Sequence, residues 1–137
     1  MQIDPLETII TWLENALTSV NGRVAAKHRY GETWSESQTG VSVHLDGGTP
    51  DHYVKVAIPR LELRIYADDQ AKIVATWMAL VALSRDNGRF TVDTSKGKAL
   101  VHYFMPTSSL SLLYDEVLKK DMGVVFFEGK ISEEAVV

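Results

Sequence analysis

The strongest constraint on the fold is a pair of strand patterns that leads directly into an apolar helix. Apolar and polar residues alternate over 40–46, which is typical of a strand with one face in the core. Turn-forming residues cluster at 47–51, and a second extended segment covers 53–67. Because the connection is short, the two strands are predicted to pair in antiparallel fashion.

The second of these strands contains a proline that divides its apolar pattern. Apolar residues occupy even positions up to Ile58 and odd positions from Leu61, and Pro59 lies between them. Proline cannot donate to a sheet ladder, so this change of phase predicts a β-bulge or a bend at Pro59. Beyond it, the face away from the core carries a polar series made of Arg60, Glu62, Arg64 and Tyr66.

An N-terminal helix is predicted from its capping residues. Asp4 is a good N-cap, Pro5 suits the first helical position, and Glu7 completes a capping-box spacing. Apolar residues recur at helical spacing from Leu6 to Val20, where an Asn-Gly pair is expected to end the helix.

A second helix is predicted from Asp68 or Asp69, acting as the N-cap, to about Arg85. Its residues are apolar over most of the circumference, which indicates burial on more than one side. We therefore expect it to lie on the sheet and also to meet the first helix or another subunit.

The remaining segments complete an α+β pattern. A short strand over 23–30 and a loop over 31–40 are predicted before the first strand pair, and a charged loop is predicted over 93–98. Strands are expected over 89–92, 99–105 and 123–127, a short helix or bent strand over 114–120, and a frayed tail over 131–137. The sequence predicts one domain over 1–137, with an antiparallel (mixed) β-sheet packed against two main α-helices.

The amino-acid composition excludes several kinds of site and classes of function. The chain has no cysteine, which excludes disulfides, thiolate zinc sites and a cysteine nucleophile, and its net charge of −4 is unusual for a general nucleic-acid binder. No serine-hydrolase elbow, phosphate loop or signal-peptide pattern is present. We therefore assign no catalytic, cofactor-binding or metal-ligating residues and expect a soluble protein that is not an enzyme.

One alternative involves the histidines beside the predicted turn. His44 and His52 flank it, and Asp46 and Asp51 lie next to them. A hairpin could bring the four together as a carboxylate–histidine metal site. The alternative function is thus a small α+β metal-binding enzyme or ligand-binding domain, although turn formation alone also accounts for these residues.

The order of elements resembles that of a known family. A capped helix, a strand pair and a strand-to-helix passage at 61–69, LELRIYADD, are similar to the tail-terminator (tail-completion, head–tail joining) proteins of long-tailed bacteriophages. The similarity extends over residues 4–119. The resemblance implies a structural virion protein that forms a ring, usually a homohexamer, at the neck of the phage. Such a ring caps the tail tube, ends its polymerisation and joins the tail to the head connector.

The resemblance also implies partners and surfaces. The partners would be further copies of the chain, the tail tube protein and the head–tail connector protein, with no membrane and no specific nucleic acid, although DNA would pass through the lumen. The protein would assemble in the host cytoplasm and remain in the virion. By hypothesis, the subunit interface contains Arg60, Glu62, Arg64, Tyr66 and Trp77, and the loops that face a partner or the lumen contain Trp34, Glu36, Lys96 and Lys98.

Overall fold

The computed structural model describes residues 4–17, 24–25, 39–51, 56–86, 88–116 and 120–133. The elements follow one another as α1 (Pro5–Ala16), β1 (Val24–Ala25), β2 (Gly40–Asp51), β3 (Val56–Tyr66), α2 (Gln70–Asp86), β4 (Phe90–Thr94), β5 (Gly97–Pro106), β6 (Ser111–Asp115) and β7 (Lys120–Glu133).

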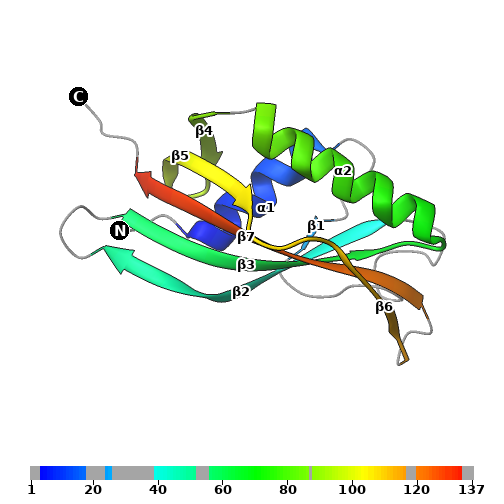
Figure 1. Cartoon of the computed structure of the whole chain (residues 1–137). Coiled ribbons are helices and arrows are strands. Elements are labelled where there is room, and N and C mark those ends of the chain that lie inside the picture. The colour runs from blue at the N-terminus through cyan, green and yellow to red at the C-terminus, as the bar shows by residue number, and fades with distance from the viewer. Residues whose placement is uncertain are drawn as a thin grey trace.

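The strands form one mixed sheet, and both helices lie on the same face of it (Figure 1). The strand order is β1-β2-β3-β7-β5-β4, and β6 also pairs with β7. All the described pairs are antiparallel except β1 with β2. This confirms the predicted α+β architecture. We call the sheet face away from the helices the outer face.

The strand β7 is the centre of the sheet and is much longer than predicted. The sequence predicted a strand over 123–127, whereas β7 covers 14 residues. It pairs with β3 along one edge, and with β5 and β6 along the other. Residues 131–133, expected to be frayed, belong to this strand, and 134–137 lie outside the described residues. Two glycines and several charged residues inside β7 conceal its length in the sequence.

The predicted turn at 47–51 is wrong, because β2 continues through it to Asp51. Leu45 lies opposite Leu61, but Gly48 lies opposite Pro59, so β2 holds one extra residue between these pairs. This is the expected bulge, carried by the partner strand rather than by the proline's own strand. Gly47 has φ +91°, a left-handed conformation that glycine adopts without steric cost.

The predicted change of phase in β3 does not occur either. The register between β3 and β7 is unbroken from Ala57 opposite Ile131 to Arg60 opposite Glu128. Residues opposite each other share a face, so the odd positions of β3 face the helices throughout. Val56 and Ile58 therefore lie on the outer face with the charged series.

The helix starts were predicted correctly, but one helix end was not. The Oδ1 atom of Asp4 accepts from the backbone N–H of Leu6 at 2.9 Å, and Asp69 Oδ1 accepts from Lys72 N–H at 2.9 Å. Both aspartates are thus N-caps. The helix α1 ends at Ala16, four residues before the predicted Val20. The prediction rested on apolar spacing and on the Asn-Gly pair that follows it, and the apolar spacing continues past the last hydrogen-bonded turn.

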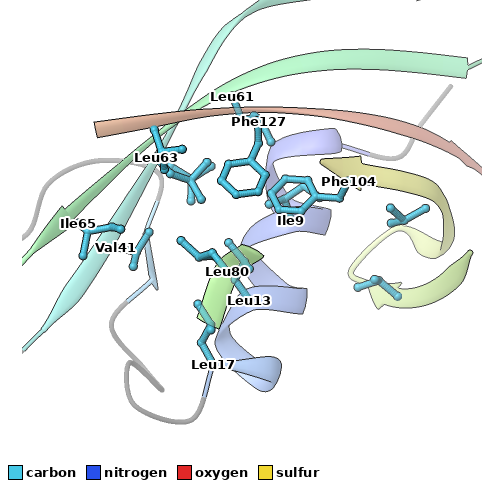
Figure 2. Close-up of a cluster of buried hydrophobic side chains, with 14 of the residues drawn as sticks. Ile9, Leu13, Leu17, Val41, Leu61, Leu63, Ile65, Leu80, Phe104 and Phe127 are labelled. Carbon is cyan, nitrogen blue, oxygen red and sulfur yellow. The ribbon is translucent and has the colours of Figure 1, made fainter. Parts of the chain in front are cut away.

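The core lies between the helices and the inward face of the sheet (Figure 2). The rings of Phe104 and Phe127 stack with centroids 4.5 Å apart, and Trp12 meets Phe104 edge-on at 5.3 Å. Trp12 also contacts Phe90 at 4.5 Å. These contacts join α1 to β4, β5 and β7. The remaining core is mostly aliphatic and fully buried, including Ile9, Leu13, Val41, Leu61, Leu63, Ile65 and Leu80.

The Glu7 side chain joins α1 to the β4–β5 turn instead of closing a capping box. Its Oε1 atom accepts from the backbone N–H of Ser95 at 2.9 Å. This hydrogen bond, with a smaller contribution from the charge of Lys96, lowers the pKa of Glu7. The contact holds the turn against the first turn of the helix.

Replacing Glu7 by glutamine should therefore flatten the pH dependence of stability. Because the pKa of Glu7 is lower in the folded state, its contribution is present above its unfolded pKa and is lost as pH falls through the folded value. Urea unfolding at pH 7 and pH 3 should show a smaller loss for Glu7→Gln than for wild type. Glu14→Gln, a matched change on the same helix, should unfold at pH 7 at the wild-type urea concentration. Equal pH dependence of wild type and Glu7→Gln would contradict this role.

Candidate subunit interface

The predicted charged series of β3 lies on the outer face, as its spacing required. Arg60 is its most exposed member. The Nε atom of Arg60 lies 3.6 Å from Asp46 Oδ2 on β2, and its guanidinium carbon is 5.2 Å from the ring centroid of Phe126 on β7. Arg60 therefore bridges three neighbouring strands across the surface of the subunit.

The next two members of the series pair with each other. The Nε atom of Arg64 donates to Oε1 of Glu62 at 2.6 Å, and both side chains are partly buried. The hydrogen bond to Glu62 raises the pKa of Arg64. The two charges thus compensate within one strand, which leaves less unpaired charge for matching against a second subunit.

Two proposed interface residues have little exposed surface, although Tyr66 shares the outer face of β3 with Arg60, Glu62 and Arg64. Tyr66 is only 1% exposed, and burial is the main cause of its raised pKa. It therefore presents no surface to a neighbour. Trp77 on α2 is half-buried and packs against the core. Its Nε1 atom is buried and has no hydrogen-bond acceptor among the residues that the structure describes.

The lysines of the predicted charged loop lie at a tight hairpin between β4 and β5. Thr94 pairs with Gly97, so Ser95 and Lys96 form the turn and the loop predicted over 93–98 is mostly strand. Lys96 and Lys98 are both exposed, and Lys98 Nζ lies 4.0 Å from Asp93. The other two proposed loop residues, Trp34 and Glu36, lie outside the described residues.

The alternative histidine–aspartate site is not brought together by the fold. His44, Asp46 and Asp51 lie along one extended strand, and His52 lies outside the described residues. Six residues of strand lie between His44 and Asp51 and separate them by roughly 20 Å, too far for ligands of one ion. The Nε2 atom of His44 is instead hydrogen-bonded to Ser42 Oγ at 2.9 Å. Within the described ranges, no group of three metal-ligating side chains is placed to hold an ion.

The structure also exposes apolar residues that the sequence analysis did not single out as a site. Leu112, Leu113 and Tyr114 of β6 are 44%, 52% and 58% exposed, and Leu45 of β2 is 59% exposed. The relevant signal was the apolar run at 110–114, which leads into the segment 114–120 that was predicted as a short helix or a bent strand. On α2, Met78 is 60% exposed and is flanked by exposed alanines at 71 and 75. The outward side of α2 therefore carries Met78 and two alanines together with the exposed Lys72, and whether another subunit covers it stays a prediction.

The chain matches no protein-family model, and a search of curated proteins finds no match either. In the part of the chain that the structure describes, neither helix has the length and apolar character needed to span a membrane.

Proposed function

We propose that this protein is a structural subunit that assembles head to tail into a closed ring, resembling the phage tail terminators that cap a tail tube and join it to the head connector. The resemblance at 61–69 and the α+β fold are compatible with that role. The observation that carries the proposal is the distribution of exposed apolar side chains at opposite edges of one sheet.

The first of these edges is β6. It pairs with β7 on one side, and no other described strand covers its second side. Three consecutive large apolar side chains on this strand, Leu112, Leu113 and Tyr114, are about half exposed. Natural proteins rarely leave an apolar edge strand open, because it invites pairing with another chain. A second copy that covers β6 accounts for this composition.

The opposite edge of the sheet is formed by β1 and β2. Among the described residues, β1 pairs only with Val41 and Ser42, and the exposed Leu45 lies further along β2. The two edges differ in sequence and lie on opposite sides of the central β3–β7 pair in the strand order. An interface between unlike surfaces is heterologous, and repeating it produces a ring when the rotation closes. The β6 edge of one copy would then meet the β2 edge of the next.

A lysine on β6 should abolish this assembly. Leu113→Lys places a charge on the open edge, where charged residues oppose strand pairing. We expect light scattering or native mass spectrometry to show about six subunits for wild type and a folded monomer for Leu113→Lys. A wild-type protein that stays monomeric at every concentration, alone and with tail tubes added, would contradict the ring.

A matched control distinguishes the sheet edge from the helix. Met78→Lys on α2 changes a side chain of similar exposure from apolar to charged. If the sheet edges form the contact, this variant keeps the mass of the wild-type assembly. Loss of assembly in Met78→Lys but not in Leu113→Lys would place the contact on the outward side of α2 instead. Arg64→Glu tests, in the same assay, the hypothesis that the charged series of β3 belongs to the subunit interface.

A further inference from the structure

A β-bulge in β5 places two consecutive polar side chains on the outer face. Val101 lies opposite Ile131 and Tyr103 lies opposite Lys130, so His102 is an extra residue in β5. The Nε2 atom of His102 is hydrogen-bonded to Ser132 Oγ at 2.8 Å. The hydroxyl of Tyr103 donates to Glu128 Oε2 at 3.0 Å. Such bulges redirect side chains and are frequent near functional sites.

Two cations lie beside the histidine of this bulge. Phe90 pairs with Val101, so Arg89, immediately before β4, is placed next to His102 on the outer face. Lys130 on β7 approaches from the other side, two residues from Ser132. Three adjacent segments thus contribute Arg89, His102 and the pair Lys130 and Ser132 to one patch.

The two cations of this patch form no ion pair within the part of the chain that the structure describes. Within the described residues, neither Arg89 nor Lys130 has an acidic group at ion-pair distance. Glu128, the nearest acidic residue on the same face of β7, is hydrogen-bonded to Tyr103. Partial burial lowers the pKa of His102, and the charges of Arg89 and Lys130 lower it further. In a chain with net charge −4, two cations that lie beside a histidine and form no ion pair among the described residues are a local concentration of positive charge.

We propose that Arg89, His102, Lys130 and the Ser132 hydroxyl form a binding site for a phosphate group, carried either by a nucleic-acid backbone or by a small phosphorylated compound. The two cations supply charge. The hydrogen-bonded pair of His102 and Ser132 leaves one donor free for the phosphate when the imidazole is neutral, and two when the imidazole is protonated. The inference does not depend on ring formation, because all four residues belong to one subunit.

The test follows the His102 ring by NMR in the wild-type protein. Inorganic phosphate is titrated at pH 7 and constant ionic strength, with chloride as the balancing salt, and a short DNA duplex is titrated separately. We expect saturable shifts of the His102 ring signals with phosphate, and a raised pKa of His102 in the bound state because the anion offsets both cations. Saturation by the duplex as well would identify a backbone phosphodiester as the source. Saturation by phosphate alone would identify a small phosphorylated compound.

Variants that remove one positive charge test whether Arg89 and Lys130 bind the phosphate. Arg89→Gln and Lys130→Gln should each weaken phosphate binding about two- to fivefold, as expected for partly exposed charge pairs, and the double variant should weaken it about four- to twenty-five-fold. Lys96→Gln, which removes an exposed cation at the β4–β5 turn, should leave the affinity for phosphate unchanged. Absence of saturable His102 shifts, or equal weakening by Lys96→Gln, would overturn the site.

Discussion

Replacing Phe127 by alanine should lower the free energy of unfolding by about 3–5 kcal/mol, the usual cost of removing a buried aromatic side chain. Phe127 is fully buried, and its ring stacks on Phe104 with centroids 4.5 Å apart. It lies opposite Leu61 in the central strand pair, so the cavity would open between the sheet and α1. Since small domains have total stabilities of about 5–15 kcal/mol, urea unfolding followed by circular dichroism should detect the change readily.

The adjacent residue provides a matched control for this prediction. Phe126 is the same residue type in the same strand, but it lies on the outer face and is only partly buried. Phe126→Ala should cost far less, and part of that cost is the contact with the Arg60 guanidinium, worth about 0.5–1 kcal/mol. Equal destabilisation by the two changes would mean that the inward and outward faces of β7 are wrongly assigned.

The second large effect is expected at Gly123, where β7 passes beneath α2. A Cβ atom at this position would lie 2.6 Å from Cγ2 of Ile73 and 2.8 Å from Cδ1 of Leu110. Ile73 is fully buried, and its Cγ2 is fixed to a branched Cβ, so it cannot move aside without a shift of the helix. We expect Gly123→Ala to lower the free energy of unfolding by about 1–3 kcal/mol, as overpacked cores do.

Two further variants test this explanation of Gly123→Ala. Gly88→Ala changes an exposed glycine around which nothing lies within 4 Å of an added Cβ, and it should alter stability by about 0.5 kcal/mol or less. Leu110→Ala in the Gly123→Ala background removes one of the two clashing atoms. The two changes should therefore cost less together than the sum of their separate costs. Strictly additive costs would argue against the clash as the cause.

The parts of the fold that depend on local sequence could be predicted. The alternation of apolar and polar residues over β3 predicted that Arg60, Glu62 and Arg64 share one face. The N-caps at Asp4 and Asp69 were predictable because each carboxylate accepts from a backbone N–H two or three residues further on. These features depend on residues within a few positions of one another. They required no knowledge of which strands become neighbours.

The parts that depend on strand neighbours could not be predicted. Glycines usually indicate turns or strand ends, but Gly47 and Gly123 both lie inside strands. Gly47 lies in the bulge of β2, and Gly123 lies where Ile73 leaves no room for a Cβ atom. Tyr66 is buried only in the completed sheet, because its neighbour there, Met122, belongs to β7, a strand far away in sequence. The cluster of Arg89, His102, Lys130 and Ser132 depends on a register shift in β5, and no residue type in that segment predicts such a shift.

The place of β7 in the chain has a consequence for how the protein folds. This strand is the only described link between the β1-β2-β3 half of the sheet and the β4-β5 half, yet it follows all the other strands in sequence. During synthesis, β3 and β5 therefore expose inner edges that can pair with nothing local until residues 120–133 have left the ribosome. Such non-local pairing gives a high contact order and slow folding, and it leaves incomplete chains prone to aggregation. A nascent chain of this protein would depend on chaperones at the stage when its two half-sheets exist but the strand that joins them does not.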